Sequence, residues 1–544
     1  MASWDWYTEE SDYTLKSRYF LEGEDVQQAA RRIARSIAKY GNDESLEQRV
    51  YELIEKGWIA LPSPVWANLG TDRGLPISCF GSYVEDSMVG ILDTLSEVGI
   101  MTKHGGGTSG FFGDLRPCGT AISGNGLSNG PVAFLKMFDS AMRVISQGAR
   151  RGSFAAYMPI EHPDIEEFLK IKSRNNDIQG LSFGVTITDA FMRDMIDGDL
   201  QKRKIWAKVL QARKEIGYPY IGFIDTVNRL KSQSYIDNEM PIYASNLCNE
   251  IWLPSSNEES FVCCLTALNA EKYDEWKDSD IVDTVIRLLD AVMEEFIEKA
   301  SGIKHMERAV KFAKEHRALG MGFTGWHSYL LSKRIPFDSF QAKALTHQIF
   351  KQVKTQAQAS TIRLGEELGP ALYASSGERN CALMAVAPNT TSSSIMGQCS
   401  PGIEPFNSNY FVAWLASRTF PRKNKYLLQE LEERGLNTDE TWGSILDHSG
   451  SIQHIDSLSE IHDVFKTFGE INQYELLRQA GDRQKFLDQG QSLNIHIPPK
   501  TPVKEINAIH IHAWECGVKG LYYQRSTSPS SNFSLSDVCT SCAG

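Results

Sequence analysis

Apolar residues recur at helical spacing in two stretches near the start of the chain. Residues 24–40 read EDVQQAARRIARSIAKY and residues 44–58 read ESLEQRVYELIEKGW, with a Gly-Asn-Asp break between them. This spacing predicts amphipathic helices, and the acidic start of the first run is typical of a helix N-terminus. The run Leu61-Pro62-Ser63-Pro64 follows, and each proline biases its predecessor away from the helical conformation. The pattern therefore predicts a small helical N-terminal region over residues 1–60.

Beyond that boundary, short apolar runs alternate with longer amphipathic ones. Buried strands are predicted for the short runs at 75–80, 180–188 and 261–266. Helices are predicted for the longer runs at 88–101, 131–147, 280–300 and 340–368. Such alternation is typical of an α/β layer or barrel, which we expect over residues 61–525. Residues 526–544 are rich in Ser and Pro and are expected to form a flexible tail.

The composition is that of an ordinary globular protein, and it narrows the range of partners. Of the 544 residues, 42% are hydrophobic and 23% are charged, as is usual for this class. The formal net charge of -12 disfavours a nucleic-acid partner, whose binding surface would be basic. The N-terminus is acidic and lacks the apolar core of a secretory signal, and no apolar run is long enough to cross a bilayer. We therefore expect neither a nucleic-acid nor a membrane partner.

The cysteines indicate a reducing compartment and a redox function. Ten cysteines in a chain this long do not make a disulfide scaffold, so a cytoplasmic location is expected, where paired cysteines are usually catalytic or bind metal. Cys539 and Cys542 form a C-x-x-C pair in the tail, and no second such pair exists to complete a zinc site. A dithiol that swings to a buried disulfide and exchanges electrons there fits better. Its candidate targets inside the protein are Cys79, Cys248, Cys263 and Cys264.

The segment Asn246-Leu247-Cys248-Asn249-Glu250 puts one thiol between a carboxamide and a carboxylate. In an extended segment or at a loop tip, residues spaced by two leave the backbone on one side. A thiol, an amide and a potential base would then meet one small ligand. The alternative is a half-buried strand with a structural cysteine, since free Cys is among the most buried residue types.

Three further segments suit an anionic ligand. The glycine-rich run HGGGTSG at 104–110 would let backbone N–H groups approach phosphate oxygens. The loop Gly148–Ser153 carries Arg150 and Arg151, and guanidinium groups bind phosphate in a two-pronged contact. The run AVAPNTTSSS at 385–394 opens from an apolar strand into hydroxyls at a helix start, which favours anion binding. The alternatives are simple turns for the first two segments and a plain helix cap for the third.

Taken together in their order along the chain, these motifs resemble one family. They are Ser78-Cys79, NLCNE at 246–250, Cys263, PNTTSS at 388–393, GIEP at 402–405, LYYQ at 521–524 and the terminal cysteine pair. The chain resembles the large, catalytic (α) subunit of ribonucleotide reductase, most closely class I. The resemblance implies a ten-stranded α/β barrel with a central finger loop that carries Cys248 at its tip. It implies reduction of ribonucleoside di- or triphosphates to 2′-deoxyribonucleotides for DNA synthesis.

The resemblance also implies roles for individual residues. Cys248 becomes a thiyl radical that takes the hydrogen from ribose C3′, Glu250 is the base toward the 3′-hydroxyl, and Asn246 hydrogen-bonds the sugar. Cys79 and Cys263 supply protons and electrons and close into a disulfide, which the tail pair Cys539 and Cys542 re-reduces, while Cys264 is structural. Substrate binding is expected at Ser63, Ser78, Gly107, Leu247, Asn249, Pro388, Asn389, Thr390, Thr391 and Ser392.

The implied cofactors and partners lie outside this chain. Tyr522 and Tyr523 would relay a radical from a separate ferritin-like small (β) subunit with a dinuclear metal site, and no metal is expected in this chain. A deoxynucleotide or ATP effector would bind at Asp86, Ser87, Met88, Arg116 and Arg151. Helices at 88–101 and 131–147 would form an α2 homodimer, and thioredoxin or glutaredoxin would be the reductant. The roughly sixty residues before the barrel are too few for the family's N-terminal ATP-cone, so none is expected.

Two other functions remain open from the sequence. A class II reductase, which draws its radical from adenosylcobalamin, would share the thiols and the tail, but the Tyr522–Tyr523 pair favours class I. A non-catalytic nucleotide-binding paralogue would keep the barrel, but it would not need the complete set of cysteines.

Overall fold

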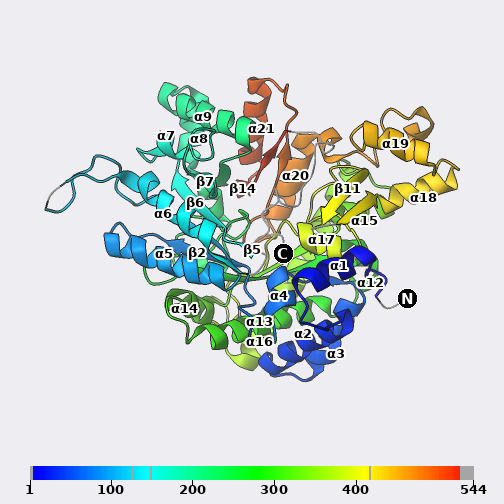
Figure 1. The fold of residues 1–544 in the computed structure, drawn as a ribbon, viewed down its shortest axis with the longest axis horizontal. Coiled ribbons are helices and arrows are strands. Elements are labelled where there is room, and N and C mark those ends of the chain that lie inside the picture. The colour runs from blue at the N-terminus through cyan, green and yellow to red at the C-terminus, as the bar shows by residue number, and fades with distance from the viewer. Residues whose placement is uncertain (1–3, 125, 148–149, 416–417, 527–544) are drawn as a thin grey trace.

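The computed structural model describes residues 4–124, 126–147, 150–415 and 418–526. The predicted redox pair Cys539 and Cys542 therefore lies outside the described residues, as does part of the loop Gly148–Ser153. In Figure 1 the N-terminal helices gather at one end of the molecule and the strands of the main sheet run through its centre.

Five parallel strands form one half of a barrel. Their hydrogen-bonded order follows the chain, and every connection contains at least one helix. The connection between β3 and β6 also contains the β4–β5 hairpin. The strands are β2 (Cys79–Tyr83), β3 (Gly107–Phe111), β6 (Phe154–Pro159), β7 (Ser182–Ile187) and β8 (Tyr220–Phe223). Their residues are almost all buried, as expected for parallel strands covered by helices.

Five more segments, also parallel to one another, form the other half. They are β9 (Phe261–Asn269), β10 (Leu319–Thr324), residues 382–386, residues 489–496 with β13 (Ile495–His496), and residues 520–525 with β14 (Gly520–Leu521) and β15 (Gln524–Arg525). Backbone hydrogen bonds from Met321 to Leu383, from Val386 to Gly490 and from Tyr522 to Leu493 join neighbouring segments. The second half is thus continuous even where its strands are irregular.

Two antiparallel seams close the ring. At one seam β2 pairs with β9, and at the other β8 pairs with β14. The result is a closed ring of ten segments, which confirms the predicted ten-stranded α/β barrel. The short strand β1 (Ile59–Ala60) pairs with the far end of β9 and ties the N-terminal region to the barrel.

Helices surround the barrel and build the N-terminal region. The N-terminal helices are α1 (Glu9–Arg18), α2 (Val26–Tyr40), α3 (Ser45–Glu55) and α4 (Ser63–Asn68). The helices of the first half are α5 (Met88–Lys103), α6 (Gly130–Val144), α7 (Ile165–Phe168), α8 (Asp189–Asp197), α9 (Leu200–Ile216), α10 (Ile224–Arg229) and α11 (Gln233–Asp237). Those between β9 and residue 395 are η1 (Ala270–Lys272), α12 (Tyr273–Trp276), α13 (Ile281–Ala300), α14 (Glu307–His316), α15 (Trp326–Ser332), α16 (Phe340–Leu368) and α17 (Thr390–Ile395).

The remaining elements follow α17. They are α18 (Lys425–Glu433), α19 (Asp439–Asp447), η2 (Asp456–Ile461), η3 (Phe468–Glu470), α20 (Gln473–Gln484), α21 (Val503–Glu515) and the hairpin β11 (Tyr410–Leu415)–β12 (Arg418–Lys423). A second hairpin, β4 (Ser146–Gln147)–β5 (Arg150–Arg151), lies earlier in the chain, between α6 and β6. Helix α13 is buried on most sides because it packs against α2, α16 and β9 at once. It is the element that joins the helical region to the barrel.

The segment around Cys248 runs inside the barrel as a finger, which we define as residues 245–252. Ser245 and Trp252 pair across its base in an antiparallel bridge. Glycines on the barrel wall make room for it, since a Cβ on Gly222 would overlap the indole ring of Trp252. A Cβ on Gly520 would lie 2.6 Å from the Ile221 carbonyl oxygen and 2.7 Å from Asn249 Nδ2. The wall can accept the finger only where these side chains are absent.

Replacement of Gly520 by alanine is therefore predicted to destabilise the barrel. The added methyl group must displace either strand β8 or the finger, and overpacking of this kind costs about 1–3 kcal/mol. The measurement is the apparent midpoint of thermal unfolding, which should fall. The matched control is Gly443→Ala in α19, where no atom lies within 4 Å of the new Cβ and alanine is the better helix former. Equal midpoints for Gly520→Ala and the unmodified protein would contradict the close approach of finger and wall.

Candidate active site

The finger ends in a tight turn that the carboxamide of Asn246 closes. Its Oδ1 accepts hydrogen bonds from the backbone N–H groups of Glu250 and Ile251, each at 3.1 Å. The chain reverses at Asn249, which has a φ of 65°, a left-handed conformation that asparagine tolerates better than most residues. The segment is thus the loop tip of the sequence prediction and not the extended strand.

The barrel wall holds this turn from two sides. The hydroxyl of Tyr157 on β6 donates to the carbonyl oxygen of Asn246 at 2.8 Å, and Asn249 Nδ2 donates to the Ile221 carbonyl of β8 at 3.2 Å. On the other side, Ser492 Oγ donates to the Cys248 carbonyl at 2.7 Å. The side chain of Asn249, predicted to bind substrate, is therefore hydrogen-bonded to the barrel wall.

Cys248 lies fully buried at the tip, in contact with an aromatic side chain from the last barrel segment. The hydroxyl of Tyr522 donates to Cys248 Sγ at 3.4 Å. The rings of Tyr522 and Tyr523 have centroids 4.1 Å apart, and Tyr523 is only partly buried. The two phenols thus form a short chain of contacts from Cys248 toward a partly exposed position, as the relay prediction requires.

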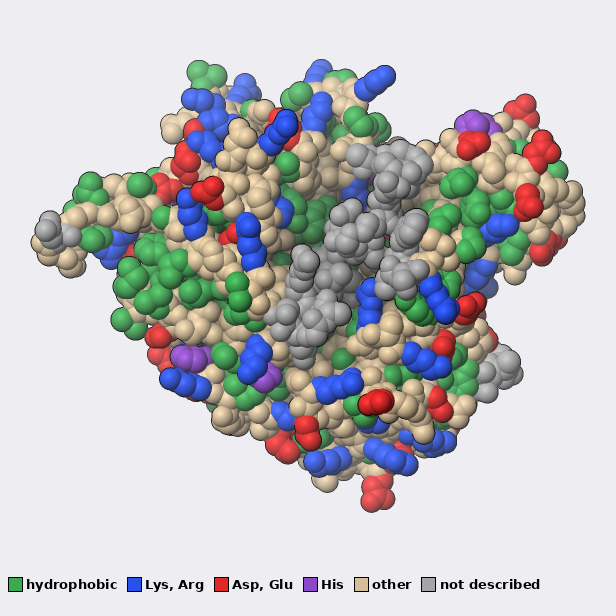
Figure 2. Space-filling view, in the orientation of Figure 1, with side chains coloured by type: hydrophobic (Ala, Val, Ile, Leu, Met, Phe, Trp, Pro, Cys, Tyr) green, Lys and Arg blue, Asp and Glu red, His purple; other side chains and the backbone are tan. Residues whose placement is uncertain are grey.

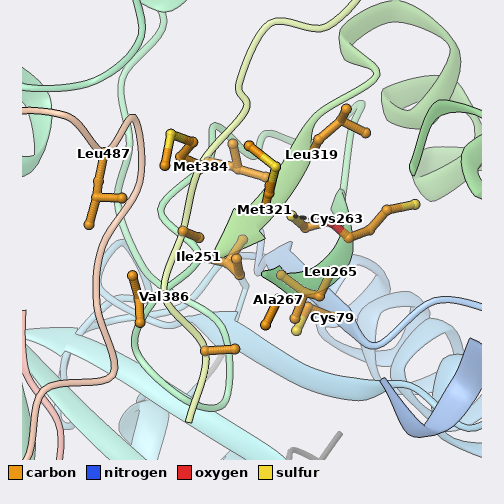
Figure 3. Close-up of a cluster of buried hydrophobic side chains, with 14 of the residues drawn as sticks. Cys79, Ile251, Cys263, Leu265, Ala267, Leu319, Met321, Met384, Val386 and Leu487 are labelled. Atoms are coloured by element: carbon orange, nitrogen blue, oxygen red, sulfur yellow. Dashed lines mark hydrogen bonds between the residues drawn. The ribbon is translucent and has the colours of Figure 1, made fainter. Parts of the chain in front are cut away.

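Cys79 and Cys263 face each other across the β2–β9 seam. They are directly paired in its antiparallel register, and opposed residues in such a pair have Cβ atoms about 4.5–5.5 Å apart, close to disulfide range. Asn246 Nδ2 donates to Cys79 Sγ at 3.2 Å, and Gln489 Nε2 donates to Cys263 Sγ at 3.7 Å. Figure 3 shows both cysteines in one buried cluster with Ile251 of the finger and Met321 of β10.

Burial keeps these two thiols protonated. It raises the pKa of Cys79 well above its usual range, and the charges of Glu250, Cys248 and Cys263 raise it further. Burial also raises the pKa of Cys263, against the hydrogen bond from Gln489, which lowers it. The negative charge of the Glu250 carboxylate thus raises the pKa of both thiols. Its Oε2 lies 3.1 Å from Ser492 Oγ, whose one proton it shares with the Cys248 carbonyl.

Cys264 points away from this site. Successive residues of a strand face opposite sides, so the Cys263 side chain faces the site and that of Cys264 faces the helical layer. There the charges of Asp290 on α13 and of Arg317 influence its pKa, which burial raises. The structural role predicted for Cys264 agrees with this placement.

The predicted phosphate-binding residues lie where the N-terminal region meets α17. Ser392 Oγ donates to the Leu61 carbonyl at 3.2 Å, which brings the start of α17 beside Ser63 at the start of α4. The Asn389 side chain donates to the Phe323 carbonyl at 3.0 Å. Ser78 Oγ is buried and has no hydrogen-bond partner among the described residues, and the Ser78 carbonyl accepts the N–H of Gly107 at 2.8 Å. An unpartnered buried hydroxyl next to Cys79 suits a polar ligand.

The predicted effector residues lie at the start of α5. Arg116 Nε donates to Asp86 Oδ2 at 2.7 Å, and the Arg116 backbone N–H donates to Asp86 Oδ1 at 3.2 Å. Ser87 caps the helix by accepting the N–H of Gly90 at 2.9 Å, and the Met88 side chain is exposed. Four of the five predicted residues are thus neighbours, while the Arg151 side chain lies outside the described part of the chain.

Several residues that contact the site were not predicted from the sequence. Ser492 and Gln489 come from a segment without a strand pattern, and Tyr157 is one aromatic residue among many in buried strands. The motif Tyr218-Pro219-Tyr220 could have been noticed, because its spacing of two puts both phenols on one face of the chain. Both hydroxyls lie 3.0 Å from the hydroxyl of Tyr523.

Comparisons with known proteins agree with this geometry. The family model "Ribonucleotide reductase, barrel domain" matches residues 77–201, 195–375 and 371–524, and "Ribonucleotide reductase, all-alpha domain" matches residues 6–74. The structure resembles the Actinobacillus ureae class Id ribonucleotide reductase alpha subunit with a TM-score of 0.92 and 44% identity, over 97% of this chain and 98% of that one.

Viral large subunits are similar over most of their length. The ribonucleoside-diphosphate reductase large subunit of Invertebrate iridescent virus 3 is 33% identical, over 94% of this chain and 92% of the relative. That of Monkeypox virus is 30% identical, over 98% of this chain and 81% of the relative. Among the described residues, no helix combines the length and the apolar character needed to span a bilayer. The chain belongs to the ribonucleotide reductase large-subunit family, as a class I enzyme that reduces ribonucleotides to 2′-deoxyribonucleotides.

Proposed function

We propose that Cys248 is the residue at which radical chemistry begins and ends in each catalytic cycle. The observation that carries this proposal is the position of the finger between two sets of groups. Its Cys248 thiol contacts Tyr522, while its Asn246 side chain contacts the Cys79 thiol. An oxidising equivalent can therefore arrive from one side, and two reducing equivalents are stored on the other.

The first step is a hydrogen-atom exchange between neighbouring side chains. A Tyr522 phenoxyl radical takes the hydrogen of the Cys248 thiol, which restores the phenol and leaves a thiyl radical. The donor–acceptor distance of 3.4 Å permits this transfer without a movement of the finger. The thiyl then takes the C3′ hydrogen of the ribose, and the Glu250 carboxylate accepts the proton of the 3′-hydroxyl.

The later steps use the thiols at the β2–β9 seam. Because their pKa values are raised, Cys79 and Cys263 hold protons that they can donate. One proton leaves with the 2′-oxygen as water, the second proton and two electrons reduce the sugar at C2′, and the two sulfurs join in a disulfide. Cys248 returns its hydrogen to C3′ and Glu250 returns its proton to the 3′-oxygen, so both residues are regenerated while Cys79 and Cys263 are oxidised.

Two steps require groups outside the barrel. One is the reduction of the disulfide back to two thiols, and the other is the generation of the radical that starts the cycle. The sequence of residues 526–544, which carries Cys539 and Cys542, supports a tail that exchanges electrons with this disulfide, and a small dithiol protein of the thioredoxin or glutaredoxin type would then reduce the tail. As a class I large subunit, the chain receives its radical from a separate small subunit. We expect that subunit to be ferritin-like with a dinuclear metal site, and to be the source of the radical that reaches Tyr523.

Substrate and effector sites follow from the same arrangement. The hydroxyls of Ser63, Ser78 and the Pro388–Ser392 segment support binding of the phosphates of a ribonucleoside diphosphate, the substrate in the names of the viral relatives. The Asp86–Arg116 pair supports an effector site for a deoxynucleotide or ATP.

A homodimer is supported by the surface beside the effector site. Exposed apolar side chains gather there on two adjacent helices, as Figure 2 shows. They are Met88, Val89 and Leu92 on α5 and Met137 and Val144 on α6. Clusters of exposed apolar residues of this kind commonly mark protein interfaces.

Replacement of Cys248 by serine is predicted to abolish turnover and to leave nucleotide binding intact. A hydroxyl has a much stronger bond to hydrogen than a thiol, so Tyr522 cannot oxidise it. We expect formation of deoxyribonucleotide to fall by at least roughly 10³-fold, or about 4 kcal/mol in the barrier. The assay combines the chain with its small subunit, and substrate binding is measured separately. The matched control is Cys264→Ser, which changes a buried thiol on the opposite face of β9 and should retain turnover. Substantial turnover by Cys248→Ser would rule out the role proposed for this thiol.

The two seam thiols are predicted to resist alkylation at mildly alkaline pH. Thiolate is the reactive species, and the raised pKa values of Cys79 and Cys263 keep them protonated at about pH 8.5, where an ordinary exposed thiol is roughly half ionised. After iodoacetamide treatment, peptide mapping should find Cys118, which is exposed, modified before Cys79 and Cys263. In denaturant, all ten cysteines should react. Modification of Cys79 at the rate of Cys118 in the folded protein would contradict the proton-holding role.

A further inference from the structure

Four tyrosines, and not two, make contact next to Cys248. Tyr522 and Tyr523 come from the last barrel segment. Across the second seam, Tyr220 is the first residue of β8 and Tyr218 lies two residues before it. The ring centroid of Tyr523 lies 5.1 Å from that of Tyr218 and 5.2 Å from that of Tyr220. The centroid of Tyr220 also lies 4.7 Å from that of Tyr522. The phenols thus form one continuous cluster.

Hydrogen bonds between the hydroxyls give this cluster a direction. The Tyr220 hydroxyl donates to the hydroxyl of Tyr523 at 3.0 Å. With that lone pair of Tyr523 occupied, its own proton can be directed to the hydroxyl of Tyr218, also at 3.0 Å. The Tyr218 hydroxyl in turn lies 3.2 Å from Ser182 Oγ. A path for a hydrogen atom therefore exists from Tyr523 to Tyr218.

Burial distinguishes the two additional tyrosines. Tyr220 is fully buried, and burial raises its pKa well above the usual range, so it remains a hydrogen-bond donor inside the protein. Tyr218 is only partly buried, as is Tyr523. Tyr218 can thus contact a group outside this chain, whereas Tyr220 cannot.

The surroundings of Tyr218 hold its ring in place and favour coupled transfer. Its ring is stacked on Phe183 of β7, with centroids 5.5 Å apart and planes at 9°. The Lys172 ammonium lies 5.2 Å from the ring centroid. A positive charge at this distance disfavours a positively charged ring, so an electron can leave the phenol readily only together with the hydroxyl proton.

We propose that Tyr218 is a member of the radical relay, one step outward from Tyr523. This inference rests on the proposed relay through Tyr523 and Tyr522 and extends it. A one-electron oxidant of the small subunit, such as a phenoxyl radical, takes the hydrogen atom of the Tyr218 hydroxyl and is itself reduced. The Tyr218 radical then takes the hydrogen atom of the Tyr523 hydroxyl, so that one O–H bond breaks and another forms. Tyr523 passes the radical to Tyr522 in the same manner.

The test is to trap the radical at single positions of the full-length chain. The probe is 3-aminotyrosine, which is oxidised more easily than tyrosine, incorporated in separate proteins at position 218, 523 or 243. Each protein is mixed with the small subunit, substrate and effector and examined by electron paramagnetic resonance. Tyr243 is the control because it stacks on Phe111 and not on the four phenols.

The expected result is an aminotyrosyl signal at 218 and at 523 and none at 243. The signal at 218 should persist when Tyr523 is replaced by phenylalanine, because Tyr218 is reached first. A signal at 523 without one at 218 would overturn this inference and leave the proposed relay standing. A signal at 218 that disappears in the Tyr523→Phe background would make Tyr218 a side branch and would also overturn it. Absence of a signal at both positions would remove the relay itself.

A simpler variant gives an independent measurement. Tyr218→Phe keeps the ring stacked on Phe183 but removes the hydroxyl that exchanges hydrogen with Tyr523. Turnover should fall at least about tenfold, with no change in the apparent affinity for substrate or in the thermal midpoint. Ser182→Ala removes the other hydrogen-bond partner of Tyr218 and should change turnover much less. Turnover of Tyr218→Phe equal to that of the unmodified protein would contradict the inference.

Discussion

The carboxamide of Asn246 fixes the finger, and the geometry of the whole site depends on that turn. Its oxygen accepts two buried backbone N–H groups, and its nitrogen donates to the Cys79 thiol. Leaving a buried donor unsatisfied costs about 1–3 kcal/mol for each group. Loss of this side chain would therefore destabilise the turn and, at the same time, remove the hydrogen bond to the Cys79 thiol. One residue thereby sets both the backbone that presents Cys248 and the contact between the finger and Cys79.

The barrel supplies two antiparallel seams, and each seam carries one part of the proposed chemistry. The β2–β9 seam pairs Cys79 with Cys263, which places the two thiols of the proposed redox pair opposite each other. The β8–β14 seam brings Tyr220 to Tyr522 and Tyr523, which places the phenols beside the finger. The finger runs inside the ring between the seams, so in the proposed mechanism Cys248 exchanges hydrogen with the phenols while the thiols reduce the substrate. Two half-barrels of opposite direction are the simplest way to obtain two such seams.

The sequence predicted the long helices better than the bounds of the strands and the turn geometry. The strand expected at 75–80 is β2 at Cys79–Tyr83, and the helix expected at 131–147 ends at Val144. The helix expected at 340–368 is α16 with the same bounds, and those expected at 88–101 and 280–300 are α5 and α13 within two residues, because their apolar faces follow helical spacing. Helix α1 was not predicted, since its buried residues include Glu10, Ser11 and Thr14, whose partners such as the Ile395 carbonyl are distant in sequence. Likewise, the alternation of Asn246, Cys248 and Glu250 gives no sign of the reversal at Asn249, and Ser492 has no local pattern. These contacts exist only once the barrel has closed.

The most direct test of the account is to identify which sulfurs are oxidised in a single turnover. The chain with Cys539→Ser and Cys542→Ser, which cannot exchange with its tail, would be fully reduced and mixed with small subunit, effector and ribonucleoside diphosphate without external reductant. Mass-spectrometric mapping should find a Cys79–Cys263 disulfide that grows in step with deoxyribonucleotide, with Cys248 still a thiol. Product formed with Cys248 in a disulfide, or without oxidation of Cys79 and Cys263, would contradict the account.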